Sequence, residues 1–246
     1  IQPLERVKRL TQEARMTTQQ QASSNLVRNL AHEIKNPLGG IRGAAQLLQR
    51  ELNPSLHEFT DIIISEADRL RDLVDRLIGP QRQTQKQICN IHQILDKIDQ
   101  LLRAEASGQV QLIRDYDPSL PELLIDANQM TQVFLNVGRN ALQALVEHQT
   151  PNGHICLKTR IVRHFTIGNI CHRLACCISI TDNGPGISAN HIEDIFFPLV
   201  THRPQGSGLG LSIAQSLIQQ HQGLIECDSQ SGQTCFNIYL PMEKLP

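Results

Sequence analysis

Three polar side chains within one helical turn, His32, Glu33 and Asn36, are the first candidates for chemistry in this sequence. Apolar residues recur at steps of three and four over residues 27–52, which is typical of a helix with one apolar stripe. His32 follows Leu30 by two positions, so it points about 200° away from that stripe, towards solvent. An exposed imidazole beside an acid can accept and release a group at neutral pH. A solvated polar face without chemistry is the alternative.

Two further groups of residues could bind a ligand. Asn136 and Asn140 lie four positions apart on one predicted helix face, where their neutral oxygens can ligate Mg²⁺ beside phosphate oxygens. Asp182 directly follows a predicted strand and precedes Gly184 and Gly186. The two glycines allow close approach of a flat ligand, and Asp182 can accept a hydrogen bond from an exocyclic amine. A tight turn stabilised by the aspartate is an equally good explanation.

A glycine-rich segment, Gly206, Gly208 and Gly210, leads into a helix predicted at residues 209–220. Backbone of this kind at a helix N-terminus can cradle phosphate. The segment lacks the Gly-Lys-Ser/Thr ending of a P-loop, and no strand precedes it, which disfavours a dinucleotide-binding fold. Arg203, on the predicted loop just before it, can reach a terminal phosphate.

The elements that must position these residues fall into two groups. Residues 1–24 predict a helical lead-in, and residues 25–80 predict two amphipathic helices in an antiparallel hairpin. Ser55 and Glu58 predict a capping box at the start of the second helix. One hairpin cannot cover both apolar stripes, so we expect a homodimer that forms a four-helix bundle. Packing of the hairpin on the chain's own C-terminal domain is the alternative.

After a polar linker at residues 81–87, short strands alternate with helices. This order predicts an α+β fold in which one mixed sheet carries helices on a single face. Strands are predicted at residues 88–91, 110–116, 123–125, 155–162, 174–181, 224–227 and 235–240, helices at 91–105, 127–148, 189–195 and 209–220, and a hairpin tip at 163–173.

Composition narrows the class of protein. The formal charge of −1 gives no electrostatic reason to expect nucleic acid as a partner, and no apolar run approaches the roughly 20 residues of a membrane span. Seven cysteines without CxxC spacing predict reduced thiols in a cytoplasmic protein rather than a metal site. The sequence begins without Met, so we expect further sequence before it.

Taken together, these motifs resemble the sensor histidine kinases of two-component signalling. The resemblance covers residues 25–241, and the segments 26–48, 114–122 and 139–145 are similar to the nitrogen-regulation branch, the NtrB-type kinases. Those kinases carry an N-terminal PAS domain, which we expect in the missing start. The motifs follow in the family's order: His-Glu-x-x-Asn-Pro from His32, the two-asparagine helix, Asp-x-Gly-x-Gly from Asp182, Phe196-Phe197-Pro198, and Gly-x-Gly-x-Gly from Gly206.

The resemblance implies a dimerisation and histidine-phosphotransfer hairpin at residues 25–80. It implies an α/β sandwich ATP-binding domain of the Hsp90, gyrase and histidine kinase type at residues 87–246. It also implies that His32 attacks the γ-phosphoryl group of ATP, that Glu33 activates the imidazole, and that Asn36 positions water for dephosphorylation of a response regulator.

ATP and Mg²⁺ are the cofactors that the resemblance implies, with the metal on Asn140. The implied partners are an NtrC-type response regulator and a PII-type signal protein. Val137-Gly138 and residues 201–205 depart from the branch, and Gly138 is expected to loosen its helix by up to ~1 kcal/mol. The implied ATP-binding residues are Asn136, Arg139, Asn140, Asp182, Gly184, Gly186, Arg203, Gly206, Gly208 and Gly210.

The predicted function is therefore an ATP-dependent histidine kinase that is also a phosphatase of its response regulator. A non-catalytic dimeric scaffold that binds nucleotide and a gyrase-like ATPase are the alternatives. Label from γ-labelled ATP that is acid-labile, base-stable and lost in His32→Gln would support the kinase over the scaffold. A gyrase-like ATPase predicts steady ATP hydrolysis that survives the loss of His32.

Overall fold

A computed structural model of the chain describes residues 33–78, 84–192, 194–201 and 208–242. The chain forms two compact units, one ending at Arg82 and the other beginning at Gln83. Among the predicted site residues, His32, Arg203 and Gly206 lie outside the described residues.

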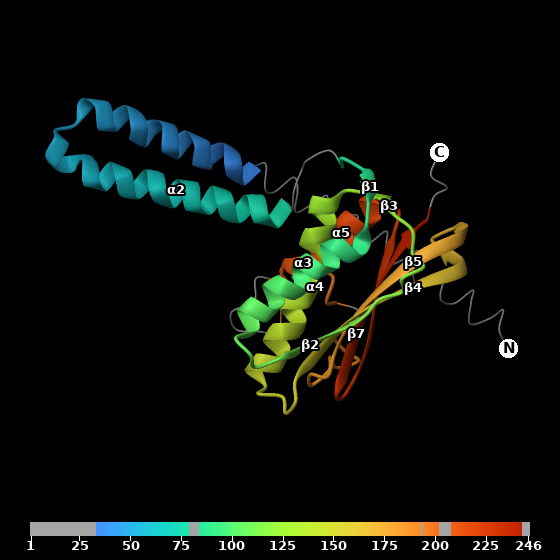
Figure 1. Cartoon of the computed structure of the whole chain (residues 1–246). Coiled ribbons are helices and arrows are strands. Elements are labelled where there is room, and N and C mark those ends of the chain that lie inside the picture. Colours follow the sequence, from blue (N-terminus) through green and yellow to red (C-terminus); the bar gives the residue numbers. More distant parts are fainter. Residues whose placement is uncertain (1–32, 79–83, 193, 202–207, 243–246) are drawn as a thin grey trace. The chain divides into compact units, whose positions relative to one another are not determined.

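The first unit is a helical hairpin, made of a helix at residues 33–51, the 3-10 turn η1 (Pro54–Leu56) and helix α2 (His57–Ile78) (Figure 1). The Asn53 side chain accepts a hydrogen bond from the backbone N–H of Ser55 and caps η1. The predicted capping box is therefore wrong, because Ser55 lies inside the 3-10 turn and not at the start of α2.

Two polar contacts fix the antiparallel register of the hairpin. Arg42 Nε lies 2.7 Å from Asp68 Oδ1, and Gln49 Nε2 donates to Asp61 Oδ1 at 2.6 Å. Nothing in the described part of this unit covers the apolar side chains on the outside of the two helices. They include Ile41, Leu48, Phe59 and Ile63, which are 43% to 61% exposed.

The second unit is a layer of helices on one face of a mixed sheet. The strand order is β2-β4-β5-β7-β6, with β2 parallel to β4 and the other neighbours antiparallel, and β1 pairs with β3 in a separate two-stranded sheet. The elements are β1 (Gln87–Cys89), α3 (Ile91–Ala106), β2 (Gln111–Asp115), β3 (Leu123–Ile125), α4 (Ala127–Glu147), β4 (His154–Ile167), β5 (Ile170–Asp182), α5 (Gly210–Gln220), β6 (Leu224–Gln230) and β7 (Gln233–Pro241).

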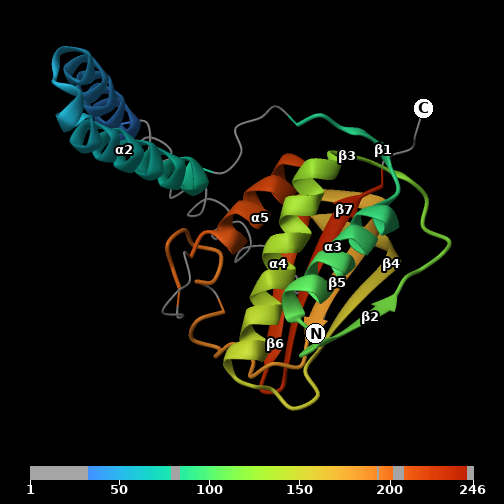
Figure 2. The same ribbon diagram turned by 60° about the vertical axis from the view of Figure 1, so that its left-hand side comes forward.

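Helices α3, α4 and α5 lie side by side over one face of the five-stranded sheet (Figure 2). Burial alternates along β7, where Thr234, Phe236, Ile238 and Leu240 face the helices. Their partners in α4 are apolar side chains at helical spacing. The helical hairpin and this α/β sandwich confirm the fold class that the sequence predicts.

Two local predictions differ from the structure. The helix predicted at residues 189–195 is wrong: in the described part of this segment the N–H groups of His191, Asp194 and Phe197 bond carbonyls three residues earlier, at 2.9 to 3.0 Å. Each bond closes a single turn, and no continuous helical ladder forms. The predicted hairpin tip at residues 163–173 is also shorter, because β4 and β5 pair as far as Ile167 and Ile170.

Close packing of α3 against α4 explains Gly138. A Cβ at this position would lie 2.6 Å from Leu102 Cδ1, and Leu102 is fully buried. Glycine here allows the two helices to approach each other. The cost of up to ~1 kcal/mol expected from helix propensity does not include this gain in packing.

The buried carboxylate of Asp99 ties the edge strand β2 to α3. It accepts hydrogen bonds from Arg103 Nε at 2.8 Å and from Arg114 of β2. Burial opposes the ionisation of Asp99, but the hydrogen bonds from Arg114 and Arg103 outweigh it and lower the pKa of the carboxyl group. Arg114 of the NtrB-like segment 114–122 therefore has a structural role.

Asp126 joins three parts of the second unit. Its Oδ1 caps α4 by accepting hydrogen bonds from the N–H groups of Asn128 and Gln129, and its Oδ2 accepts one from Gln85 N at 2.9 Å. The backbone N–H of Asp126 donates to Nε2 of His221 at 3.0 Å. The start of α4, the end of α5 and the chain that enters this unit thus meet at one residue.

The same contacts predict a pH dependence of stability. His221 is 2% exposed, and its Nδ1–H donates to Leu217 O at 2.9 Å while Nε2 accepts, so the ring is held neutral. Burial lowers the pKa of His221, and nearby Lys86 lowers it further. The hydrogen bond to Leu217 O and the charge of Asp126 raise this pKa but do not outweigh burial. A histidine with a lowered pKa stabilises the fold fully above about pH 6.5, and the stabilisation is lost as the pH falls below that value.

We therefore expect the free energy of unfolding in urea to fall between pH 7.5 and pH 5.5, and to fall less steeply in His221→Gln, whose amide oxygen can still accept from Asp126 N–H. Equal slopes in the two proteins would contradict this role of His221.

Candidate functional site

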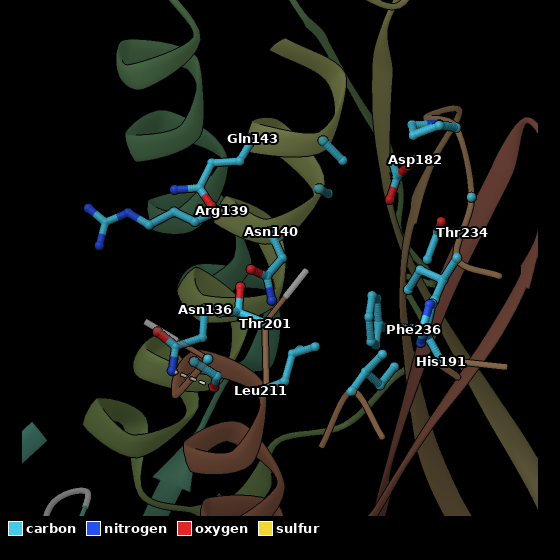
Figure 3. Close-up of a pocket in the computed structure, with 18 of the residues that line it drawn as sticks. Asn136, Arg139, Asn140, Gln143, Asp182, His191, Thr201, Leu211, Thr234 and Phe236 are labelled. Carbon is cyan, nitrogen blue, oxygen red and sulfur yellow. Dashed lines mark hydrogen bonds between the residues drawn. The ribbon is translucent and has the colours of Figure 1, made fainter. Parts of the chain in front are cut away.

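A pocket of about 580 Å³ lies between α4 and the segments that follow β5 and precede α5 (Figure 3). It brings together residues from distant parts of the second unit. The predicted residues Asn136, Arg139, Asn140, Asp182, Gly186, Gly208 and Gly210 line it, together with Ala141, Gln143, Ala144, His148, Pro185, Ile187, Ser188, His191, Ile195, Val200, Thr201, Leu211, Thr234 and Phe236.

Helix α4 provides the polar wall. Asn136, Arg139 and Asn140 follow one another at i, i+3 and i+4, so they share one side of the helix. Asn136 Nδ2 donates to the carbonyl of Gly210 at 3.0 Å and holds the first residue of α5 against α4. Figure 3 shows Asn140 on the α4 side of the pocket, with Asp182 and Phe236 on the other side.

The opposite wall begins at Asp182, the last residue of β5, which is 3% exposed. Its Oδ1 accepts a hydrogen bond from Gly184 N at 2.9 Å. A Cβ on Gly184 would lie 2.6 Å from that oxygen and 3.6 Å from Ala144 Cβ, so the contact requires glycine. Thr234 of β7 pairs with Asp182 in register and is also buried.

Two more glycines are required by backbone geometry. Gly186 has φ +87°, and a Cβ there would lie 2.3 Å from Gln230 O. Gly208 has φ +65°, and its Cβ would meet the backbone of Leu199 at 2.6 Å. Gly210 differs, since its nearest neighbour would be Asn136 Cβ at 3.7 Å, an ordinary contact.

The sequence pattern alone did not single out the apolar side of the pocket. Phe236 lies across from the α4 wall (Figure 3), and its ring meets that of Phe196 edge to face, with centroids 6.3 Å apart. The alternation of β7 places Phe236 and Thr234 on the helix-facing side, and counting from buried Ile238 would have found both. A flat apolar group can therefore lie beside the Asp182 carboxylate.

The pocket offers a limited chemistry. One buried carboxylate can accept from an amine, apolar side chains can enclose a ring, and amides near the N-terminus of α5 can face an anion. In the described part of the chain no group of three or more His, Cys, Asp or Glu side chains could hold a metal ion, and the cysteines are all free. A cation here would need amide oxygens such as that of Asn140, a donor type that suits Mg²⁺.

Glu33 and Asn36 lie on the exposed side of the helix at residues 33–51, in the other unit. They are three residues apart and so share one face of that helix. Because His32 lies outside the described residues, its relation to them stays a prediction. No helix in the described part of the chain is long and apolar enough to cross a membrane.

Comparison with protein families identifies both units. Residues 22–86 match the His Kinase A (phospho-acceptor) domain. Residues 125–244 match the histidine kinase-, DNA gyrase B-, and HSP90-like ATPase family.

A curated relative is similar over almost the whole chain. The sensory histidine kinase/phosphatase NtrB of Vibrio alginolyticus is 51% identical over 243 residues, which is 98% of this chain and 69% of the relative.

Solved structures share the fold. Full-length ShkA in complex with AMPPNP has a TM-score of 0.59 and 22% identity, and the match covers 90% of this chain and 46% of ShkA. The histidine kinase ThkA in complex with the response regulator TrrA has a TM-score of 0.56 and 21% identity, over 95% of this chain and 66% of ThkA. Given the 51% identity to the Vibrio relative and the two family matches, this chain belongs to the NtrB family of sensory histidine kinase/phosphatases.

Proposed function

We propose that this NtrB-family enzyme transfers the γ-phosphoryl group of ATP to His32 and then to the receiver aspartate of an NtrC-type response regulator. The observation that carries the proposal is the pocket in which Asp182 and Phe236 face Asn140 across a space for a nucleotide. The family match of residues 22–86 to a phospho-acceptor domain supports a histidine as the acceptor.

Within the pocket, Asp182 accepts a hydrogen bond from the adenine amine, and Gly184 and Gly186 allow the base to approach the backbone. The phosphates lie towards Gly208 and Gly210, with Asn136 and Arg139 beside them. Arg203 and Gly206 complete this part of the site by resemblance alone. Catalysis of phosphoryl transfer consists mainly of such positioning and charge neutralisation.

We further propose Asn140 as the residue that holds Mg²⁺. Its side chain lies on the pocket wall next to Asn136, and a neutral amide oxygen leaves coordination positions for phosphate and water. When bound, the ion neutralises phosphate charge. Asn140 orients this end of the nucleotide through the same oxygen.

In the first unit, Glu33 hydrogen-bonds and activates the imidazole, and Asn36 orients water for dephosphorylation of the regulator. The exposed apolar face of the hairpin supports a homodimer, since a second copy would cover Ile41, Leu48 and Phe59 in a four-helix bundle. We assign dimerisation and phosphotransfer to residues 25–80, catalysis to residues 87–246 and a lead-in to residues 1–24.

Family membership supports the choice of partners. ThkA has been solved with a response regulator, and the NtrB relatives are named as kinase and phosphatase. We propose an NtrC-type regulator as the substrate and a PII-type protein as the control of the balance between the two activities, in nitrogen regulation. The decisive experiment incubates the chain with γ-labelled ATP and Mg²⁺, then adds a purified NtrC receiver domain and follows movement of label to the receiver.

Asn140→Asp should lower the rate of autophosphorylation on the order of tenfold, as expected for loss of about 1.4 kcal/mol of transition-state stabilisation. The added charge repels the phosphates and alters the position of the ion. Initial rates over a range of Mg²⁺ concentrations measure the effect. Asn128→Asp, a solvent-side change near the start of the same helix, is the matched control, and equal rates in the Asn140 variant and the wild type would exclude this role.

Asn36→Ala should slow dephosphorylation of the regulator several-fold more than it slows autophosphorylation, because only the former needs an oriented water. Both rates are measured on the same preparation, the first with pre-phosphorylated receiver domain. Losses of equal size would show that Asn36 supports the helix and not the water.

A further inference from the structure

Arg139 of α4 is held by Glu105, near the end of α3. Its Nε donates to both carboxylate oxygens, at 3.1 and 3.0 Å, and its Nη2 donates to Oε1 at 2.5 Å. This forked pairing directs the guanidinium away from Asp182 and Phe236 (Figure 3). The hydrogen bond from Arg139 lowers the pKa of Glu105, so both partners are charged at neutral pH.

The pocket itself has a shortage of positive charge. Arg139 is the only lysine or arginine among the lining residues of the described chain, and Asn136, Asn140 and Gln143 on the same helix carry neutral amides. Among the described lining residues, only Arg139 could therefore offer a guanidinium to a bound polyphosphate, and this guanidinium is paired with Glu105.

Arg139 also lies at the end of the pocket where phosphates are expected. A Cβ on Gly184 would lie 3.6 Å from Ala144 Cβ, and one on Gly210 would lie 3.7 Å from Asn136 Cβ, so the pocket extends along two turns of α4. With the base at Gly184, the phosphates extend towards Asn136, next to Arg139.

The pair with Glu105 is weak enough to exchange. The side chains of Arg139 and Glu105 are 49% and 35% exposed, and exposed pairs typically change an equilibrium by only about two- to fivefold. Phosphate oxygens accept the same forked hydrogen bonds as a carboxylate and carry more charge.

We propose that Arg139 pairs with Glu105 while the pocket is empty, and that its guanidinium leaves Glu105 and binds the phosphates when the nucleotide binds. The inference rests on the proposed function and deepens it. Glu105 competes with the phosphates for one cation, and so it sets the affinity for ATP without touching the ligand.

The test measures the dissociation constants of ATP and adenosine by calorimetry on the full chain, in the presence of Mg²⁺. Glu105→Gln and Glu105→Ala should each bind ATP about two- to fivefold more tightly than the wild type, with adenosine affinity unchanged. Arg139→Gln should bind ATP about tenfold more weakly, since charge-assisted hydrogen bonds are lost. In the Glu105→Gln/Arg139→Gln double variant the gain should vanish. Glu122→Gln, which removes the same charge away from the pocket, is the control.

The inference would be overturned by unchanged ATP affinity in both Glu105 variants, by an equal gain for adenosine, or by a gain that persists without Arg139. Weaker ATP binding in all the Glu105 and Arg139 variants would also overturn it and show that the pair only braces α3 against α4. A wild-type chain that binds neither ligand would instead refute the proposed function.

Discussion

His32→Gln should eliminate phosphorylation of the chain by ATP while leaving ATP affinity unchanged. Glutamine resembles histidine in size and polarity, but its amide nitrogen is not a nucleophile, so no covalent phosphoryl intermediate can form. The described residues that line the nucleotide pocket all belong to the other unit and come from α4, β5, β7, α5 and the segments between them. Label incorporated from γ-labelled ATP, measured beside nucleotide binding, separates the two properties.

The stability of the label identifies its site. Phosphohistidine is labile in acid and stable in base, whereas phosphoserine behaves in the opposite way. His57→Gln, a change at the start of α2 in the same unit, should label normally. Label that survives in His32→Gln would place the acceptor on another side chain, and steady ATP hydrolysis that is unaffected by the substitution would favour a gyrase-like ATPase.

Asp182→Asn should lower the affinity for ATP about a hundredfold, the upper range for losing a buried hydrogen bond to a charged group. The carboxylate is 3% exposed and cannot be replaced by water without cost. Asparagine keeps its shape but presents an N–H₂ group where an acceptor is needed, facing the amine of the base. Titration with a fluorescent ATP analogue gives the dissociation constants.

Folding has to be checked in the same variant, because Asp182 Oδ1 also accepts from Gly184 N. The unfolding temperature without nucleotide reports on that contact. Asp228→Asn, on β6 and outside the pocket, is the matched control. An Asp182→Asn protein that folds normally and binds ATP as the wild type does would remove Asp182 from the adenine site.

The sequence predicted most of the fold because its patterns are local. Asp126 at the N-cap predicts the start of α4, and the alternation of apolar residues predicts β7. Each of these signals spans only a few residues. Gly184 and Gly186 were predicted to allow close approach of a flat ligand, and Gly208 to belong to a phosphate cradle, and these roles stay predictions. In the structure each of these glycines lies close to other atoms of the chain, which a Cβ would strike.

What the sequence did not predict depends on partners far along the chain. The pairing of Arg139 with Glu105 spans 34 positions, and the contact that requires Gly138 comes from Leu102 on another helix. The helix predicted at residues 189–195 failed for the same reason, since apolar spacing there reflects packing of Ile195 and Phe196 on the core and not a helical ladder. Local spacing carries no information on which distant surface a segment meets.

The carboxylate of Asp126 is shared between two contacts, the hydrogen bond from Gln85 N and the N-terminal cap of α4. One oxygen anchors Gln85, close to where the chain enters the second unit, and the other stabilises the first turn of the helix that carries Asn136 and Asn140. If a ligand stabilises this helix through Asp126, it also strengthens the hydrogen bond from Gln85 N. That hydrogen bond then strengthens ligand binding by the same free energy. Loss of the bond from Gln85 N to Asp126 would therefore weaken the binding of any ligand in the pocket that stabilises the first turn of α4.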